Sequence, residues 1–233
     1  MWQSNLFNKF KETDVVYGIY TERKTPSSLF PNVTKTETNY ELKCPAVNTT
    51  SAKYYEVNSF IDVDIEIFYN KETKQIEYKY DFNTSKHPLF DTVHDLIKAH
   101  VIVGKKGNQY DVQILTPYIF LTDNKDIEIT TLNPDVPTEN LSFVSGSFNL
   151  YSWARNLNLA YVFIDNDKLA KLKLSIDKPI LKYFFSKPIN LKYKTFNDKQ
   201  LKFIKSNYNI VKYRKRINNL YTTHLQRRPK KLL

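Results

Sequence analysis

Residues 60–82, which read FIDVDIEIFYNKETKQIEYKYDF, decide the fold of this chain. The first half alternates a largely acidic set of side chains with an apolar set: Phe60, Asp62, Asp64 and Glu66 against Ile61, Val63, Ile65 and Ile67. Alternation with a period of two places the two sets on opposite faces of a strand. Residues 75–82 repeat the pattern, and the polar linker at 70–74 supplies turn chemistry. The stretch therefore predicts a β-hairpin with one face in solvent and the other buried.

Short strand-like runs continue along most of the chain. They are rich in β-branched and aromatic residues, and turn residues separate them at intervals of about ten. The runs are 15–20, 101–103, 110–121, 126–132, 143–153, 157–164, 171–176 and 180–185. Such spacing is typical of a β-sandwich and not of alternating β/α units. We therefore predict a mainly β fold, either an antiparallel β-sandwich or a jelly-roll-like barrel.

Two segments show helical spacing instead. Pro88 precedes four apolar residues that predict one short internal helix running into the strand at 101–103: Leu89, Val93, Leu96 and Ile97. Gly104 and Gly107 then predict a hairpin turn. Near the N-terminus, the helical spacing of Trp2, Leu6 and Phe10 predicts a short amphipathic helix or an arm.

The C-terminal end is predicted as a basic helical extension. Asn197 or Asp198 can cap a helix with an apolar stripe of Leu201, Ile204, Tyr208, Val211 and Ile217 or Leu220. The predicted domains are a β-sandwich with an N-terminal arm, residues 1–195, and a basic helical extension with a tail, residues 196–233. Residues 224–233 are too charged and too short of core residues to predict as folded. Deletion of residues 212–233 is therefore expected to leave the melting temperature within a few degrees.

Charge is distributed unevenly along the chain. The net charge is +11, yet residues 181–233 alone contribute +14, with 15 lysines and arginines against the single acid Asp198. A polyanion contact is therefore predicted for this end only, with nucleic acid or an acidic protein surface as the partner. The alternative is a solvated basic tail that keeps the protein soluble. The candidate polyanion-binding residues are Lys212, Arg214, Lys215, Arg216, Arg227, Arg228, Lys230 and Lys231.

Composition excludes several classes of protein. With 4 Gly and 1 Cys among 233 residues, the chain is not a collagen, a disulfide scaffold or a glycine-rich phosphate binder. No apolar run approaches the roughly 18 residues of a membrane span, and the first residues lack the order of a signal peptide. We therefore expect an intracellular protein with no membrane partner. Because no catalytic or cofactor motif rises above chance in the sequence, we also expect it to be non-enzymatic and without a cofactor. Whether it forms a homo-oligomer stays open.

A metal-dependent enzyme is the main alternative. His87, His94 and His100 lie within 14 residues, and with Asp91 they could hold a transition metal. Such a site would belong to a cupin-like enzyme that acts on a small metabolite or nucleotide. A jelly-roll metal site usually needs a carboxylate two residues after a histidine, whereas Asp95 follows His94 directly. Surface or capping histidines are therefore the favoured interpretation.

Three smaller signals favour structural roles. Cys44 has no partner cysteine, and Ser145 lacks the glycine pattern of a nucleophile turn. The acidic residues of 62–66 resemble a cation site, but a solvent-facing strand face explains them more simply.

Four segments carry a resemblance to a known family. They are a Lys-Cys-Pro-Ala stretch at Lys43–Ala46, a run at Gln113–Leu121, a segment from Gly146 to Ala160 and a strand at Lys178–Phe185. Their order resembles an uncharacterised family of conserved hypothetical proteins from tailed phages, especially phages of marine bacteria. The resemblance implies a β-sandwich, cupin-like in shape, with no established activity and no catalytic residues. It also implies a phage-type binding or structural protein, in the host cytoplasm or as a virion component, with Trp153 and Arg155 as a family feature.

Overall fold

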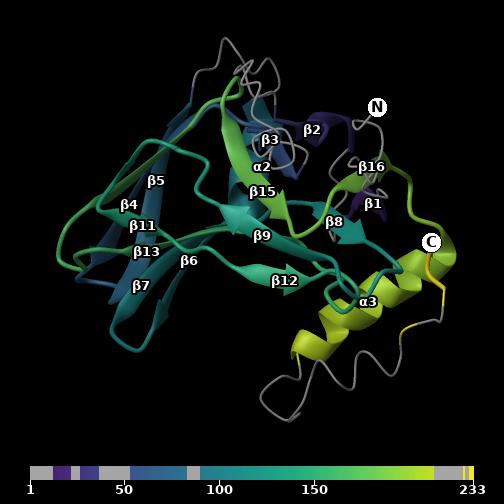
Figure 1. Ribbon diagram of the computed structural model, residues 1–233. Helices are drawn as coiled ribbons and strands as arrows, with labels where there is room; N and C mark the ends of the chain where they lie inside the picture. The colour runs from purple at the N-terminus through teal and green to yellow at the C-terminus, as the bar shows by residue number, and fades with distance from the viewer. Residues whose placement is uncertain (1–12, 22–26, 37–52, 83–89, 213–227, 229–230) are drawn as a thin grey trace, which may run out of the picture.

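A computed structural model describes residues 13–21, 27–36, 53–82, 90–212, 228 and 231–233 (Figure 1). The first strands are β1 Thr13–Ile19, β2 Thr34–Lys35, β3 Tyr54–Asn58, β4 Val63–Asn70, β5 Gln75–Phe82, β6 Val101–Lys106, β7 Gln109–Ile114 and β8 Tyr118–Leu121. The later strands are β9 Glu128–Leu132, β10 Thr138–Glu139, β11 Leu141–Phe143, β12 Ser147–Asn149, β13 Leu159–Phe163, β14 Ala170–Leu174, β15 Pro179–Phe185 and β16 Ile189–Tyr193. The helices are a short 3₁₀ turn η1 Ser27–Leu29, α2 Phe90–His100 and α3 Asp198–Lys212.

The predicted hairpin is confirmed as β4 and β5. The two strands pair antiparallel from Val63 opposite Phe82 to Asn70 opposite Gln75. The Asn70 side chain closes the turn by accepting the backbone N–H of Glu72 at 2.9 Å. Ile61, Val63, Ile65 and Ile67 are buried, as predicted, whereas Asp64 and Glu66 face solvent. Phe60 departs from the predicted pattern: it lies before the strand and is buried, with its ring 5.1 Å from that of Phe30.

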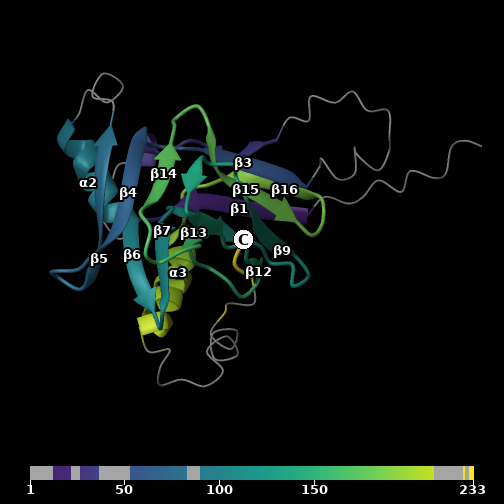
Figure 2. The same cartoon turned by 90° about the vertical axis from the view of Figure 1, so that its left-hand side faces the viewer.

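The described strands form four sheets, mainly antiparallel, in an arrangement consistent with the predicted β-sandwich (Figures 1 and 2). Their strand orders are β10-β14-β4-β5, β11-β13-β7-β6, β12-β9-β15-β3-β2 and β16-β1-β8. The last sheet contains a parallel pair, because β1 aligns with β16 from Thr13 opposite Ile189 onward. Buried apolar side chains from all four sheets form one main core.

The predicted internal helix is confirmed as α2, which runs directly into β6. Figure 2 shows α2 beside β5, where the Tyr80 hydroxyl contacts Nδ1 of His94. Gly107 lies in the turn between β6 and β7 with φ +63°, as expected for a hairpin glycine. Gly104 instead belongs to β6, opposite Asp111. The predicted N-terminal helix or arm lies outside the described residues.

Strand β8, with the sequence YIFL, is buried on both faces. Tyr118 and Phe120 join the main core, whereas Ile119 and Leu121 pack with Phe203 and Ile204 of α3. A strand that is covered on both sides is expected to read as a continuous apolar run. Helix α3, predicted as an extension of the β domain, therefore forms a layer over the sheet that contains β8.

The N-terminus of α3 is fixed by a reciprocal cap. Asn197 accepts the backbone N–H of Gln200 through its side chain at 3.0 Å, and the Gln200 side chain accepts the N–H of Asn197 at 3.0 Å. This capping box satisfies two backbone donors at the helix start. Asn197 is thus the cap, and Asp198 lies in the first turn, where its charge complements the helix dipole.

Candidate polyanion-binding surface

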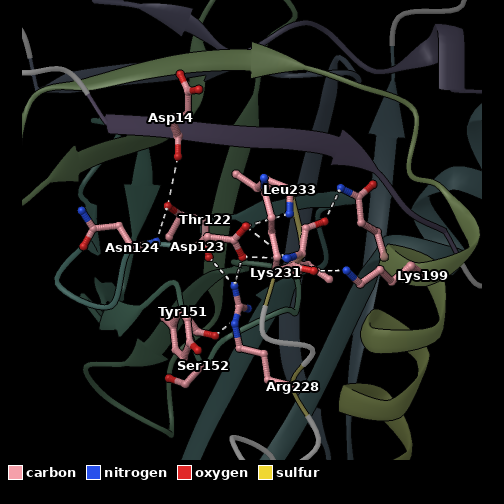
Figure 3. A network of polar contacts seen from close by, with 12 residues as sticks. Asp14, Thr122, Asp123, Asn124, Tyr151, Ser152, Lys199, Arg228, Lys231 and Leu233 are labelled. Atoms are coloured by element: carbon pink, nitrogen blue, oxygen red, sulfur yellow. Dashed lines mark hydrogen bonds and ion pairs between the residues drawn. The ribbon is translucent and has the colours of Figure 1, made fainter.

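Arg228 is an internal residue, although it was predicted to contact a polyanion. Its guanidinium donates to the backbone oxygen of Tyr151 and to Oδ1 of Asp123, both at 2.8 Å (Figure 3). It also donates to the backbone oxygen of Thr122 and lies 3.8 Å from the centroid of the Tyr151 ring. The side chain is 1% exposed. Its charge is therefore paired with Asp123 inside the fold.

The same Asp123 carboxylate holds the last two residues of the chain. Its oxygens accept the backbone N–H of Leu232 at 2.8 Å and that of Leu233 at 2.9 Å (Figure 3). The Leu232 side chain is 2% exposed and packs with the α3 residues Phe203 and Ile204. Residues 228 and 231–233 thus belong to the folded body, contrary to the expectation of an unfolded tail.

The loop that carries Asp123 is itself fixed. The Thr122 hydroxyl donates to the backbone oxygen of Asp14 at 3.0 Å and accepts the N–H of Asn124 at 3.2 Å. Thr122 is completely buried. Asp123 is therefore presented from a rigid turn directly after β8. No periodic pattern marks this residue in the sequence, so its role is not predictable from the sequence.

The remaining predicted cations have different positions. Lys231 is exposed. Lys212 ends α3, and its side chain lies outside the described part of the structure. The other predicted cations, which are Arg214, Lys215, Arg216, Arg227 and Lys230, also lie outside the described residues.

A cationic surface lies on α3, as the predicted basic helix implies, although Lys199, Lys202 and Lys205 are not among the predicted polyanion-binding residues. Lys199, Lys202 and Lys205 are exposed at successive i, i+3 positions, while Phe203 and Ile204 point into the second core. Lys199 Nζ also donates to the backbone oxygen of Lys231, which joins the chain end to the same surface. Lys199, Lys202, Lys205 and Lys231 are called the α3 lysine face below.

The charges of the α3 lysine face are not neutralised locally. Within the described part of the chain, none of its four ammonium groups forms an ion pair with a carboxylate. By contrast, Lys192 on β16 lies 3.1 Å from Asp14. The hydrogen bonds from Lys192 and Asn190 hold the pKa of the Asp14 carboxyl below its usual range. Among the described lysines of this end, Lys182, Lys187 and Lys192 therefore have acidic partners, whereas those of the α3 lysine face do not.

The histidines have separate partners. His94 contacts Tyr80, and Nδ1 of His100 lies 2.6 Å from the backbone oxygen of Leu115. Among the residues that the structure describes, no three His, Cys, Asp or Glu side chains are grouped as a metal site would require. His87 and the Asp91 side chain are outside those residues.

The smaller candidates also have structural contacts. Ser145 donates to the backbone oxygen of Thr131 at 2.6 Å, and Asp64 pairs with Lys173 at 2.9 Å. Arg155 lies with its guanidinium 5.5 Å from the Trp153 ring centroid. Cys44 is outside the described residues.

Comparison of the chain with models of protein families, with curated proteins and with solved structures gave no match. The resemblance to phage proteins therefore stays a prediction. Of the helices in the described residues, none has the length and apolar character to cross a membrane.

Proposed function

We propose that this protein is a non-enzymatic binding protein whose α3 lysine face docks on the phosphate backbone of nucleic acid. The observation that carries the proposal is the geometry of α3. One side of the helix packs on β8 through Phe203 and Ile204. On the other side, Lys199, Lys202 and Lys205 are exposed to solvent. A row of cations on a fixed helix suits a linear polyanion.

The basic residues that follow α3 extend this surface in sequence. Lys212, Arg214, Lys215, Arg216, Arg227 and Lys230 stay candidates for the same contact, whereas Arg228 is removed from the set because it is buried against Asp123. Contacts of lysine and arginine with phosphates are electrostatic and independent of base sequence. The proposed interaction therefore gives affinity without sequence readout.

Nucleic acid is favoured over an acidic protein because exposed lysines repeat along α3 with one acid, Asp198, among them, and few apolar anchors accompany them. A specific protein interface usually has buried aromatic or apolar anchors at its centre. The side chains that line the shallow groove along α3 are instead Asp198, Leu201, Lys202, Lys205 and Ser206. In a phage, such a protein would act in the host cytoplasm or as a virion component; this part of the proposal rests on the resemblance alone.

The direct test is a titration of the full chain into fluorescein-labelled single-stranded and double-stranded DNA of arbitrary sequence, followed by anisotropy at several salt concentrations. The expected result is binding at low salt, with a logarithm of affinity that falls linearly as the logarithm of salt rises. Equal affinity for unrelated sequences is also expected. Binding of polyglutamate in preference to DNA would overturn the proposal in favour of an acidic protein partner.

A further inference from the structure

The sheet β11-β13-β7-β6 has one side in the main core and the other side in solvent. Val112 and Ile114 of β7 and Tyr161 and Phe163 of β13 are buried in the core. Because side chains alternate along a strand, the residues between these four point away from the core. The solvent-facing side of this sheet is therefore formed by a second, separate set of residues.

The register of the strands places these residues in rows across the sheet. Ala160 lies opposite Gln113, and Gln113 lies opposite Ile102. Val144 joins the same row, because its backbone N–H donates to the backbone oxygen of Ala160 at 2.8 Å. The next row along the sheet consists of Ser142, Val162, Asp111 and Gly104.

Ile164 extends the solvent-facing side past the end of β13. Its backbone N–H donates to the backbone oxygen of Asn140 at 3.1 Å, so the ladder continues by one residue. Ile164 is 71% exposed, Ile102 47% and Val144 43%, and these are three of the six exposed large apolar side chains among the described residues. The apolar sheet face is defined as Ile102, Val144, Ala160, Val162 and Ile164.

The sheet β10-β14-β4-β5 provides a contrast, because its solvent-facing side is charged. Lys171 and Lys173 of β14 lie opposite Glu66 and Asp64 of β4, and Lys79 of β5 also lies opposite Glu66. All five side chains are exposed. The two sheets belong to the same protein, yet only one presents apolar side chains to solvent. A contiguous exposed apolar patch marks a surface that binds a partner.

Asp111 is the only charged residue of the two rows. Its Oδ2 accepts a hydrogen bond from Nε2 of Gln113 at 3.1 Å. Its Oδ1 lies 2.8 Å from the position that a Cβ would take at Gly104. The carboxylate therefore occupies the space above the glycine and already has an amide donor within the face.

A second copy of this chain suits the apolar sheet face. Each copy carries a net charge of +11, so contacts between charged surfaces of two copies are opposed by repulsion. The apolar sheet face adds little to that repulsion, since its rows contain a single charge. Two sheets of the same twist also pack face to face at about 10 Å, with their strands within about 30° of each other. A sheet face that pairs with itself about a twofold axis meets this condition.

We propose that two copies of the chain associate through the apolar sheet face in a symmetric dimer. Four strands about 4.8 Å apart, over about six residues of 3.3 Å each, give a face of roughly 20 by 20 Å. Two such faces form a contact of roughly 800 Å², below the roughly 1,200 Å² at which stable interfaces begin. The dimer is therefore weak, with an expected Kd between about 10 and 300 µM. The apolar sheet face and the α3 lysine face share no residue, so this inference does not rest on the proposed nucleic-acid function.

Sedimentation equilibrium of the full chain, from about 5 µM to about 500 µM, tests the inference. The weight-average mass should rise with concentration from 27.6 kDa toward twice that value. Added salt should strengthen the association because it screens the net positive charge, whereas the proposed DNA binding should weaken. A chain that stays monomeric at every concentration, in low and in high salt, would overturn the inference and leave the face to a different partner.

Lysine substitutions locate the contact. Val162→Lys and Ile164→Lys should each weaken the dimer about tenfold or more, because each places two unpaired charges in an apolar contact. Ile176→Lys is the matched control: Ile176 is also exposed, but it lies in the turn between β14 and β15, and its substitution should leave the Kd unchanged. A dimer that persists in both face variants, or that Ile176→Lys weakens equally, would contradict the proposed interface.

Methyl NMR of the unmodified chain gives a second measurement that does not depend on how the variants fold. On dilution through the Kd, the methyl signals of Ile102, Val144, Val162 and Ile164 should shift together, and that of Ile176 should not. Shifts confined to other residues would show that the copies associate through a different surface.

Discussion

Arg228 and Asp123, 105 residues apart in the chain, form an ion pair of 2.8 Å in which the arginine side chain is 1% exposed and the aspartate 27%. The same carboxylate binds the backbone of Leu232 and Leu233. One acidic side chain after β8 therefore holds the C-terminal end of the chain against α3.

Asp123→Ala should destabilise the protein by about 3 kcal/mol, because removal of one partner leaves the buried Arg228 charge uncompensated. Urea denaturation followed by circular dichroism measures this change. Asp64→Ala is the matched control, since Asp64 and Lys173 form an exposed pair and its loss should cost less than about 1 kcal/mol. Equal effects of the two substitutions would show that the Asp123 contact is not a structural anchor.

Leu232→Ala should lower the free energy of unfolding by about 2–4 kcal/mol, because the side chain is buried against Phe203 and Ile204. The adjacent Lys231 is exposed, so Lys231→Ala should change stability by no more than about 0.5 kcal/mol. Deletion of residues 228–233 should destabilise at least as much as Leu232→Ala. If the deletion variant were as stable as the full chain, the contacts of residues 228–233 would not stabilise the fold, as expected for an unfolded tail.

Gly18→Ala should destabilise by about 1–3 kcal/mol through overpacking. A Cβ at Gly18 would lie 2.6 Å from the backbone oxygen of Lys194 and 2.7 Å from the Phe196 ring, which joins the sheet to α3. Gly107→Ala is the comparison, because nothing lies within 4 Å of its Cβ and only its positive φ is unfavourable. The thermal denaturation midpoint should fall further for Gly18→Ala. The reverse order would mean that both the Lys194 backbone and the Phe196 ring can move away without loss.

Stability should decrease as the pH falls through about 4. Hydrogen bonds from Thr73 and Asn70 lower the pKa of Glu77, as those from Lys192 and Asn190 lower that of Asp14. A carboxyl with a lower pKa in the folded state stabilises the fold above its unfolded pKa, and the contribution is lost as the folded form is protonated. Urea midpoints at pH 7 and at pH 3 measure the loss. Glu77→Gln should make the difference smaller, and an unchanged difference would exclude Glu77 as a contributor.

Local patterns predicted the parts of the fold that depend on neighbours in sequence. The β4–β5 hairpin followed from alternation in residues 60–82, and the start of α3 followed from a capping residue before an apolar stripe. Both signals are local because cross-strand pairs and helix caps form between nearby residues.

Long-range pairings were not predictable from such patterns. The parallel alignment of β1 with β16 joins the first and the last of the described strands, and the sequence of neither strand specifies its partner. The position of Arg228 was not predictable for the same reason. Its place in a basic run predicts an exposed side chain, but the fold places Asp123 beside it and buries it. The density of charged residues in a sequence therefore predicts the sign of the charge on a surface. It does not predict which of those residues form ion pairs inside the fold.

The salt dependence of DNA binding by two triple variants tests the central claim most directly. The first variant combines Lys199→Ala, Lys202→Ala and Lys205→Ala. The second, which is the control, combines Lys35→Ala, Lys71→Ala and Lys178→Ala. Both triple variants remove three positive charges from exposed lysines, but only the first removes them from α3. If α3 contacts the phosphates, the first variant should bind more weakly and show a slope of log affinity against log salt that is shallower by about 2 to 3. The second variant should keep the slope of the unmodified protein. Equal slopes for the two variants would contradict the claim that the α3 lysine face binds nucleic acid.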